Sequence, residues 1–141
     1  MHCLAIAMSQ KNNFLVTGSD EKIYDPSYSR LKEYKLLPDK MGWYPERVHT
    51  GISAVIVGMH VAVDNPELVK AKELGLKVFS FPEFLFQQTR SKTRIVVAGS
   101  YGKSTTAAII LYVLKQLKMD TDYVIGALPE GFENRNRLSY E

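Results

Sequence analysis

The most informative stretch of this 141-residue chain is Arg94-Ile-Val-Val-Ala-Gly-Ser-Tyr-Gly-Lys-Ser-Thr-Thr-Ala107. An apolar, β-branched run is followed by two glycines, then by Lys-Ser-Thr, and then by a helical pattern. Glycine adopts backbone angles that other residues avoid, so successive N–H groups can turn toward a phosphate, while the next helix presents its positive end. The order of these features predicts a strand, a phosphate-binding loop and a helix.

The side chains of this loop suit nucleotide phosphates. Lys103 is placed to reach the outer phosphates as a point charge, and the Ser104 hydroxyl is placed to hold Mg²⁺. The full pattern G-x-x-x-x-G-K-[ST] requires a glycine where this chain has Val97, so only the shorter form from Gly99 to Thr105 is present. Two other interpretations stay open: a glycine-rich turn with an incidental lysine, and a loop for some other anion.

Composition restricts the class of protein. Hydrophobic residues make up 45% and charged residues 23% of the chain, as in folded globular proteins. The net charge of +3 is spread along the sequence without a long basic run, so no nucleic-acid partner is predicted. Cys3 is the only cysteine, which excludes an internal disulfide. No membrane-spanning run or secretory signal is indicated, and we expect a cytoplasmic protein.

Strand and helix patterns alternate along the chain, which predicts an α/β fold with a parallel sheet. Helices are expected at residues 3–10, 26–37, 66–74, 82–89 and 103–118. Strands are expected at residues 14–17, 54–58, 77–80, 94–98 and 123–126. The turn-rich connection from Pro38 to Pro45 receives no function. A polar link, Arg90-Ser-Lys-Thr93, predicts a boundary between a domain at 1–90 and a domain at 91–141.

A second candidate site follows the predicted strand at 14–17. Gly18-Ser19-Asp20 forms a polar tip there, and open parallel sheets commonly bind ligands beyond the carboxyl ends of their strands. Ser19 and Asp20 are therefore candidate ligand contacts. Serine and aspartate are also preferred in helix caps and turns, and the residues alone do not decide between these two interpretations.

Three motifs together resemble a known family. They are Gly18-Ser19-Asp20, then Asp64-Asn65-Pro66-Glu67, and then Ala98-Gly-Ser-Tyr-Gly-Lys-Ser-Thr-Thr106. The combination resembles the Mur ligases of peptidoglycan synthesis, nearest to the branches that join UDP-N-acetylmuramate to L-alanine or to a recycled murein tripeptide. The closing Val124 to Phe132 and Arg137-Leu138 look more like the tripeptide branch.

The resemblance implies a fold, ligands and site residues. It implies a Rossmann-like UDP-binding domain followed by the start of a P-loop ATP-binding domain, with Ser19 and Asp20 at the UDP-sugar. ATP and Mg²⁺ are the implied cofactors, with Ser104 at the metal and Lys103 in a catalytic role. The implied ATP-binding residues are Gly99, Ser100, Tyr101, Gly102, Lys103, Ser104 and Thr105. Tyr101 departs from the histidine or asparagine common in the family.

The resemblance also implies that this chain is an amino-terminal fragment. The family's first strand and glycine-rich loop are expected before Met1, and its central-domain glutamate and histidine and its last domain after Glu141. The implied activity is ATP-dependent amide formation through an acyl phosphate, with the fragment alone inactive. The alternatives are a P-loop NTPase or kinase of another kind, and a non-catalytic module that binds a UDP-sugar or nucleotide. The oligomeric state is not indicated.

Overall fold

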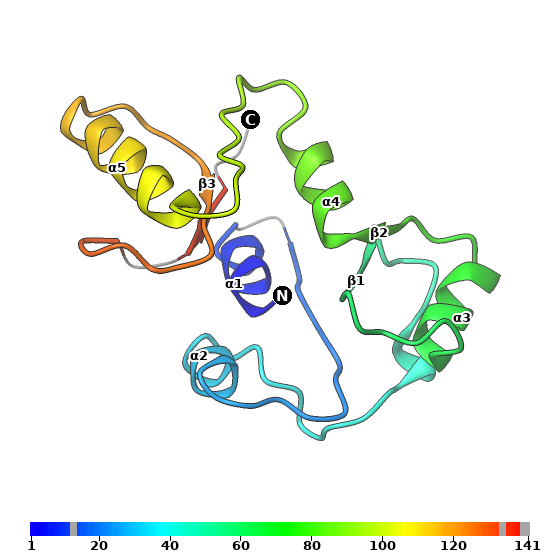
Figure 1. Ribbon diagram of the computed structural model, residues 1–141. Coiled ribbons are helices and arrows are strands. Elements are labelled where there is room, and N and C mark those ends of the chain that lie inside the picture. Colours follow the sequence, from blue (N-terminus) through cyan, green and yellow to red (C-terminus); the bar gives the residue numbers. More distant parts are fainter. Residues whose placement is uncertain (12–13, 133–134, 139–141) are drawn as a thin grey trace. The chain divides into compact units, whose positions relative to one another are not determined.

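The computed structural model of the protein describes residues 1–11, 14–132 and 135–138 (Figure 1). The chain forms two compact units. The first comprises Thr17–Arg94 together with Met1, and the second comprises His2–Val16 and Ile95–Glu141, whose residues 139–141 lie outside the described part. No helix in the described ranges is long and apolar enough to cross a membrane.

The first unit contains a parallel strand pair with helices around it. β1 (Val55–Val57) pairs with β2 (Val78–Ser80) in parallel, with Val55 opposite Val78. Helix α3 (Pro66–Glu73) connects the two strands, and α4 (Phe81–Gln88) follows β2 directly (Figure 1). The short elements α2 (Ser27–Glu33) and η1 (Pro45–Arg47) precede β1. This β-α-β-α order confirms the α/β class with a parallel sheet.

Local capping explains why the helices of this unit begin where they do. The Asn65 side chain accepts hydrogen bonds from the N–H groups of Glu67 and Leu68, and Pro66 occupies the first turn. Ser80 and Glu83 form a reciprocal capping box at the start of α4. Buried apolar side chains on these two helices are Leu68, Ala71 and Phe84.

The second unit combines α1 (His2–Ser9) with α5 (Lys103–Gln116) and a short strand pair. β3 (Tyr123–Val124) and β4 (Asn136–Arg137) run antiparallel, and α1 packs against β4. The buried apolar side chains of this unit are Leu4, Ile6, Ala7, Met8, Leu111, Ile125 and Leu138. Apolar residues recur at helical spacing on one face of α5, and of Ala107, Ile110, Leu111 and Leu114 only Leu111 is buried, while the cap residue Leu117 is 64% exposed.

Two predicted strands are absent from the described residues. Residues 14–17 form no strand, and Leu15 is 96% exposed. Residues 94–98 likewise form no strand, with Ile95 67% and Val96 83% exposed. The apolar composition of both segments suits a strand, but a strand also requires a neighbour to accept its backbone hydrogen bonds. β4, which the sequence analysis did not anticipate, is the strand that pairs with β3.

The break between the two units at Arg94 and Ile95 lies near the predicted boundary after residue 90. The amino-terminal helix α1, however, groups with the second unit rather than with the first. The assignment of residues 1–90 and 91–141 to a UDP-sugar domain and an ATP domain stays a prediction.

Candidate functional site

The loop that precedes α5 depends on two glycines in left-handed backbone conformations. Gly99 has φ 151° and Gly102 has φ 71°, and Gly102 is the cap residue of α5. A β-carbon on Gly102 would meet no atom within 4 Å, and one on Gly99 would make only an ordinary contact with the Tyr101 carbonyl. Backbone angle rather than crowding therefore favours glycine at both positions.

Helix α5 begins without a side-chain cap. The first turn carries Lys103, Ser104 and Thr105, all exposed, and it contains no acidic residue. Thr106 is the first residue whose N–H bonds back to the loop, at 2.9 Å from the Gly102 oxygen. Because the earlier N–H groups of a helix have no partner within it, this end can receive hydrogen bonds from an anion.

The Lys103 side chain folds back over the loop. Its ammonium group donates to the carbonyl oxygens of Gly99, at 2.6 Å, and Ser100, at 3.1 Å. Lys103 is thus held over the backbone of the loop that precedes it. Gly99, Ser100, Gly102 and Lys103 lie in this one loop, and their role at a nucleotide phosphate stays a prediction.

The start of α5 lies beside the end of β3. Ser104 Oγ is 3.8 Å from the position that a β-carbon on Gly126 would take, and Gly126 follows β3 by two residues. The loop therefore lies near the carboxyl end of that strand. Tyr101, in the same loop, is 96% exposed.

Ser19 and Asp20 lie in the first unit, apart in the sequence from the loop of the second unit. Ser19 is half-buried and Asp20 is exposed. The Asp20 carbonyl oxygen accepts a hydrogen bond of 2.8 Å from the Gly42 N–H, which forms an isolated antiparallel bridge. The Asp20 carboxylate thus stays accessible while its backbone is held.

Sequence reasoning missed the segment that holds Asp20. Gly42 has φ 134°, and the Trp43 indole N–H donates to the Glu21 carboxylate at 3.1 Å. Both residues belong to the turn-rich connection from Pro38 to Pro45, to which the sequence analysis assigned no function. The sequence Gly42-Trp43-Tyr44, a glycine followed by two aromatic residues, was the signal that could have indicated a structured segment there.

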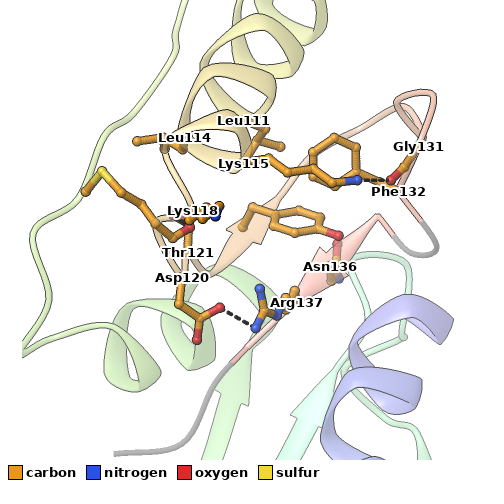
Figure 2. A pocket seen from close by; sticks show the side chains of 12 residues that line it. Leu111, Leu114, Lys115, Lys118, Asp120, Thr121, Gly131, Phe132, Asn136 and Arg137 are labelled. Atoms are coloured by element: carbon orange, nitrogen blue, oxygen red, sulfur yellow. Dashed lines mark hydrogen bonds and ion pairs between the residues drawn. The ribbon is translucent and has the colours of Figure 1, made fainter.

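A separate pocket of about 450 Å³ lies at the opposite end of α5, and Figure 2 shows its lining side chains. Lys115 donates to the Gly131 oxygen at 2.7 Å and lies over the Phe132 ring, while Asp120 and Arg137 form an ion pair. Residues 99–105 do not line it. Across the described ranges, no group of three or more histidine, cysteine or acidic side chains is placed to hold a metal ion.

The sequence and the fold of this chain are similar to those of known proteins. No family model matches the chain. The chain is 34% identical to the UDP-N-acetylmuramate–L-alanine ligase of Carboxydothermus hydrogenoformans, with 83% of the chain and 25% of that relative covered. The corresponding enzyme of Levilactobacillus brevis is 35% identical, with 100% of the chain and 31% of the relative covered. The enzyme of Caldicellulosiruptor saccharolyticus is 38% identical, with 87% and 27% covered.

A solved structure agrees with these relatives. The UDP-N-acetylmuramate:L-alanyl-γ-D-glutamyl-meso-diaminopimelate ligase of Neisseria meningitidis superposes with a TM-score of 0.76 and 25% sequence identity, covering 95% of this chain and 42% of that one. These matches support a Mur ligase amino-terminal fragment. The chain spans between a quarter and a third of the length of the curated relatives it matches.

Proposed function

We propose that this chain is the nucleotide-binding part of an ATP-dependent Mur ligase that joins UDP-N-acetylmuramate to L-alanine or to a murein tripeptide. The observation that carries the proposal is the loop before α5, with Gly99 and Gly102 in left-handed conformations and Lys103 held over it. Similarity to two kinds of Mur ligase, one adding L-alanine and one adding a tripeptide, supports the choice of reaction.

The ATP site comprises one loop and one helix start. Backbone N–H groups between Gly99 and Thr105 would surround the phosphates, and Lys103 would exchange its two carbonyl partners for phosphate oxygens. The assigned ATP-binding residues are Gly99, Ser100, Tyr101, Gly102, Lys103, Ser104 and Thr105. Such positioning and charge stabilisation is most of what a protein contributes to phosphoryl transfer.

Ser104 suits one ligand position of a Mg²⁺ ion that arrives with ATP. Ser104 is exposed at the start of α5, and its hydroxyl lies near Gly126, which has no side chain. Mg²⁺ commonly keeps several waters and takes phosphate oxygens among its remaining ligands. When bound, the cation would neutralise negative charge on the phosphates.

Ser19 and Asp20 form the proposed contact with the UDP-sugar, and they belong to the first unit, which also contains the parallel β1–β2 pair. The muramyl carboxylate of that substrate would attack the γ-phosphate of ATP and release ADP. The incoming amine would then attack the acyl carbon of the resulting acyl phosphate, form the amide bond and release inorganic phosphate. We assign no residue of this chain to the amine.

One experiment separates this function from its alternatives. Phosphate release is measured with ATP, Mg²⁺ and UDP-N-acetylmuramate, with and without L-alanine or the tripeptide, on this chain and on the full-length protein that contains it. A ligase releases phosphate only when the UDP-sugar and an amine are both present. A kinase or NTPase turns over ATP without the UDP-sugar, and a binding module retains ligand without turnover.

A further inference from the structure

The segment Met41 to Tyr44 connects the proposed UDP-sugar contact to helix α3. At one end, the Gly42 N–H donates to the Asp20 carbonyl oxygen at 2.8 Å. At the other end, the Tyr44 N–H donates to the Glu67 carboxylate at 2.7 Å. The two donor residues, Gly42 and Tyr44, are separated only by Trp43. A shift of the Tyr44 backbone therefore also shifts the Gly42 N–H.

The segment is held by side chains as well as by its backbone. The Tyr44 hydroxyl donates to the Met41 oxygen at 3.1 Å, and the Arg47 guanidinium lies 4.4 Å from the centre of the Tyr44 ring. The Trp43 indole donates to Glu21, the residue after Asp20. The segment therefore meets the Asp20 region at two points, one in the backbone and one through a side chain.

Glu67 provides a rigid support for this segment. It is half-buried in the first turn of α3, and its own N–H donates to the Asn65 side chain at 3.0 Å. Asn65 is only 6% exposed, and it also caps Leu68, whose side chain is buried. A carboxylate on a capped helix start is a fixed acceptor, in contrast to a carboxylate on a loop.

We propose that Glu67 is a positioning residue for the UDP-sugar site, because its carboxylate fixes the Tyr44 N–H and thereby the Gly42 N–H that holds the Asp20 backbone. The proposal rests on the proposed function for the identity of the ligand at Asp20. The proposal also has a mechanical part, which states that the Glu67 carboxylate stabilises the Gly42–Asp20 hydrogen bond. This part does not depend on any ligand.

Helix α4 contains a matched control for this proposal. Glu83 is also an acidic residue in a helix first turn, and its carboxylate also accepts a backbone N–H, from Ser80 at 2.8 Å. This hydrogen bond closes within the cap of α4 itself. Removal of Glu83 therefore reproduces the loss of a capping carboxylate in the same unit without releasing the segment from Met41 to Tyr44.

The first experiment measures amide hydrogen exchange in the 141-residue chain and in its Glu67→Ala, Glu67→Gln and Glu83→Ala variants. Since a hydrogen bond to a charged group is worth about a tenfold change or more in a local equilibrium, we expect the Gly42 amide of Glu67→Ala to exchange about ten times faster. Glu67→Gln keeps an acceptor oxygen and should show a smaller increase. Glu83→Ala should leave Gly42 unchanged.

The outcome at Gly42 decides the mechanical part. Equal exchange rates for the Gly42 amide in the native chain and in Glu67→Ala would overturn it, since the bridge would then form without Glu67. Equal acceleration by Glu67→Ala and Glu83→Ala would also overturn it, because that result indicates a general loss of stability.

The second experiment measures binding of UDP-N-acetylmuramate and of ATP to the full-length protein that contains this chain. Glu67→Ala should weaken UDP-N-acetylmuramate binding about tenfold and leave ATP binding unchanged, Glu67→Gln should restore most of the affinity, and Glu83→Ala should change neither. A native protein that binds no UDP-sugar contradicts the proposed function. A native protein that binds it, with equal affinity in Glu67→Ala, contradicts the positioning role alone.

Discussion

The Lys103 ammonium group lies 2.6 Å from the Gly99 carbonyl oxygen. This contact joins the first residue of α5 to the first glycine of the preceding loop, and a second contact, to the Ser100 oxygen at 3.1 Å, reinforces it. Both acceptors are exposed backbone groups that water can satisfy when the lysine leaves. If a phosphate enters the loop, the Lys103 ammonium group can therefore exchange its two carbonyl acceptors for phosphate oxygens without leaving a buried carbonyl unpaired.

We expect Lys103→Ala to weaken ATP binding by about tenfold or more while the free energy of unfolding changes by less than about 0.5 kcal/mol. The lysine is exposed, so its removal should cost little stability, whereas its bond to a phosphate is charge-assisted. Calorimetric titration with ATP, in parallel with thermal unfolding, measures both quantities.

Lys115→Ala is the matched control on the same helix, because Lys115 bonds to the Gly131 oxygen and lies over the Phe132 ring. It should leave ATP binding unchanged. Equal ATP affinity in Lys103→Ala and in the native chain would remove the phosphate-loop assignment.

Asp20→Ala should weaken UDP-N-acetylmuramate binding and leave ATP binding unchanged, because Asp20 belongs to the first unit and the loop of Lys103 to the second. The Asp20 backbone bond to Gly42 is retained in the variant, so the loss is confined to the carboxylate. Binding of each ligand to the full-length protein is the measurement. Asp39→Ala, a change at another exposed carboxylate of the same unit, serves as the control. Equal loss of both ligands would indicate unfolding instead of a lost contact.

Asn65→Ala should lower the free energy of unfolding by about 0.5–2 kcal/mol, the usual range for loss of a helix cap. Its amide oxygen accepts from the Glu67 and Leu68 N–H groups, and the residue is buried. Urea denaturation followed by circular dichroism measures the change. Asn65→Asp keeps an acceptor at the same position and should retain most of the stability, so equal destabilisation by both substitutions would contradict the capping role.

The free energy of unfolding should decrease at acid pH, because the capping box of α4 requires an ionised Glu83. Hydrogen bonds from the Ser80 hydroxyl and the Ser80 N–H hold the pKa of Glu83 below its ordinary value of 4.5. Because the folded pKa is lowered, the ionised carboxylate favours the folded state. This contribution is fully present above pH 4.5 and is lost as the pH falls through the lower folded value.

The measurement is urea denaturation at several values between about pH 3 and about pH 7, for the native chain and for Glu83→Gln. The native chain should lose more stability than the variant over the acid part of this range. Parallel curves for the two proteins would show that Glu83 contributes nothing to the acid response.

The 141-residue chain alone should form no acyl phosphate. Residues 94–98, which lead into the loop before α5, form no strand, and the β1–β2 and β3–β4 sheets have only two strands each among the described residues, which is marginal in water. Catalysis requires donors that are fixed before the reaction begins. Trapping with hydroxylamine in the presence of ATP, Mg²⁺ and UDP-N-acetylmuramate tests this, with the L. brevis ligase as positive control. Hydroxamate formed by the purified chain would contradict the expectation.

Helix starts and ends could be predicted from the sequence because their signals are local. Asn65-Pro66 begins α3, and Gly75, with φ 65°, follows its end; Ser80 and Glu83 cap α4 within four residues. Gly102 and Lys103 were likewise placed correctly at the start of α5. Each of these signals operates between neighbours in the chain, so no knowledge of the rest of the fold is required.

Strand pairing could not be predicted in the same way. The apolar runs around Leu15 and Val96 have strand composition but no strand partner among the described residues, whereas the polar pair Asn136-Arg137 forms β4 opposite β3. The Glu67–Tyr44 hydrogen bond spans 23 positions, and no sequence pattern marks it. Contacts of this kind depend on which segments the fold brings together.

Helix α1 has a consequence for the order in which the chain folds. Its side chains Leu4 and Ile6 are almost fully buried, and the strand that it packs against, β4, is made of residues near the other end of the sequence. During synthesis the helix leaves the ribosome first, and its partner leaves after more than a hundred further residues. Closure of so long a loop is slow and entropically costly. The apolar side of α1 is therefore open to chaperones and to other nascent chains until β4 has left the ribosome.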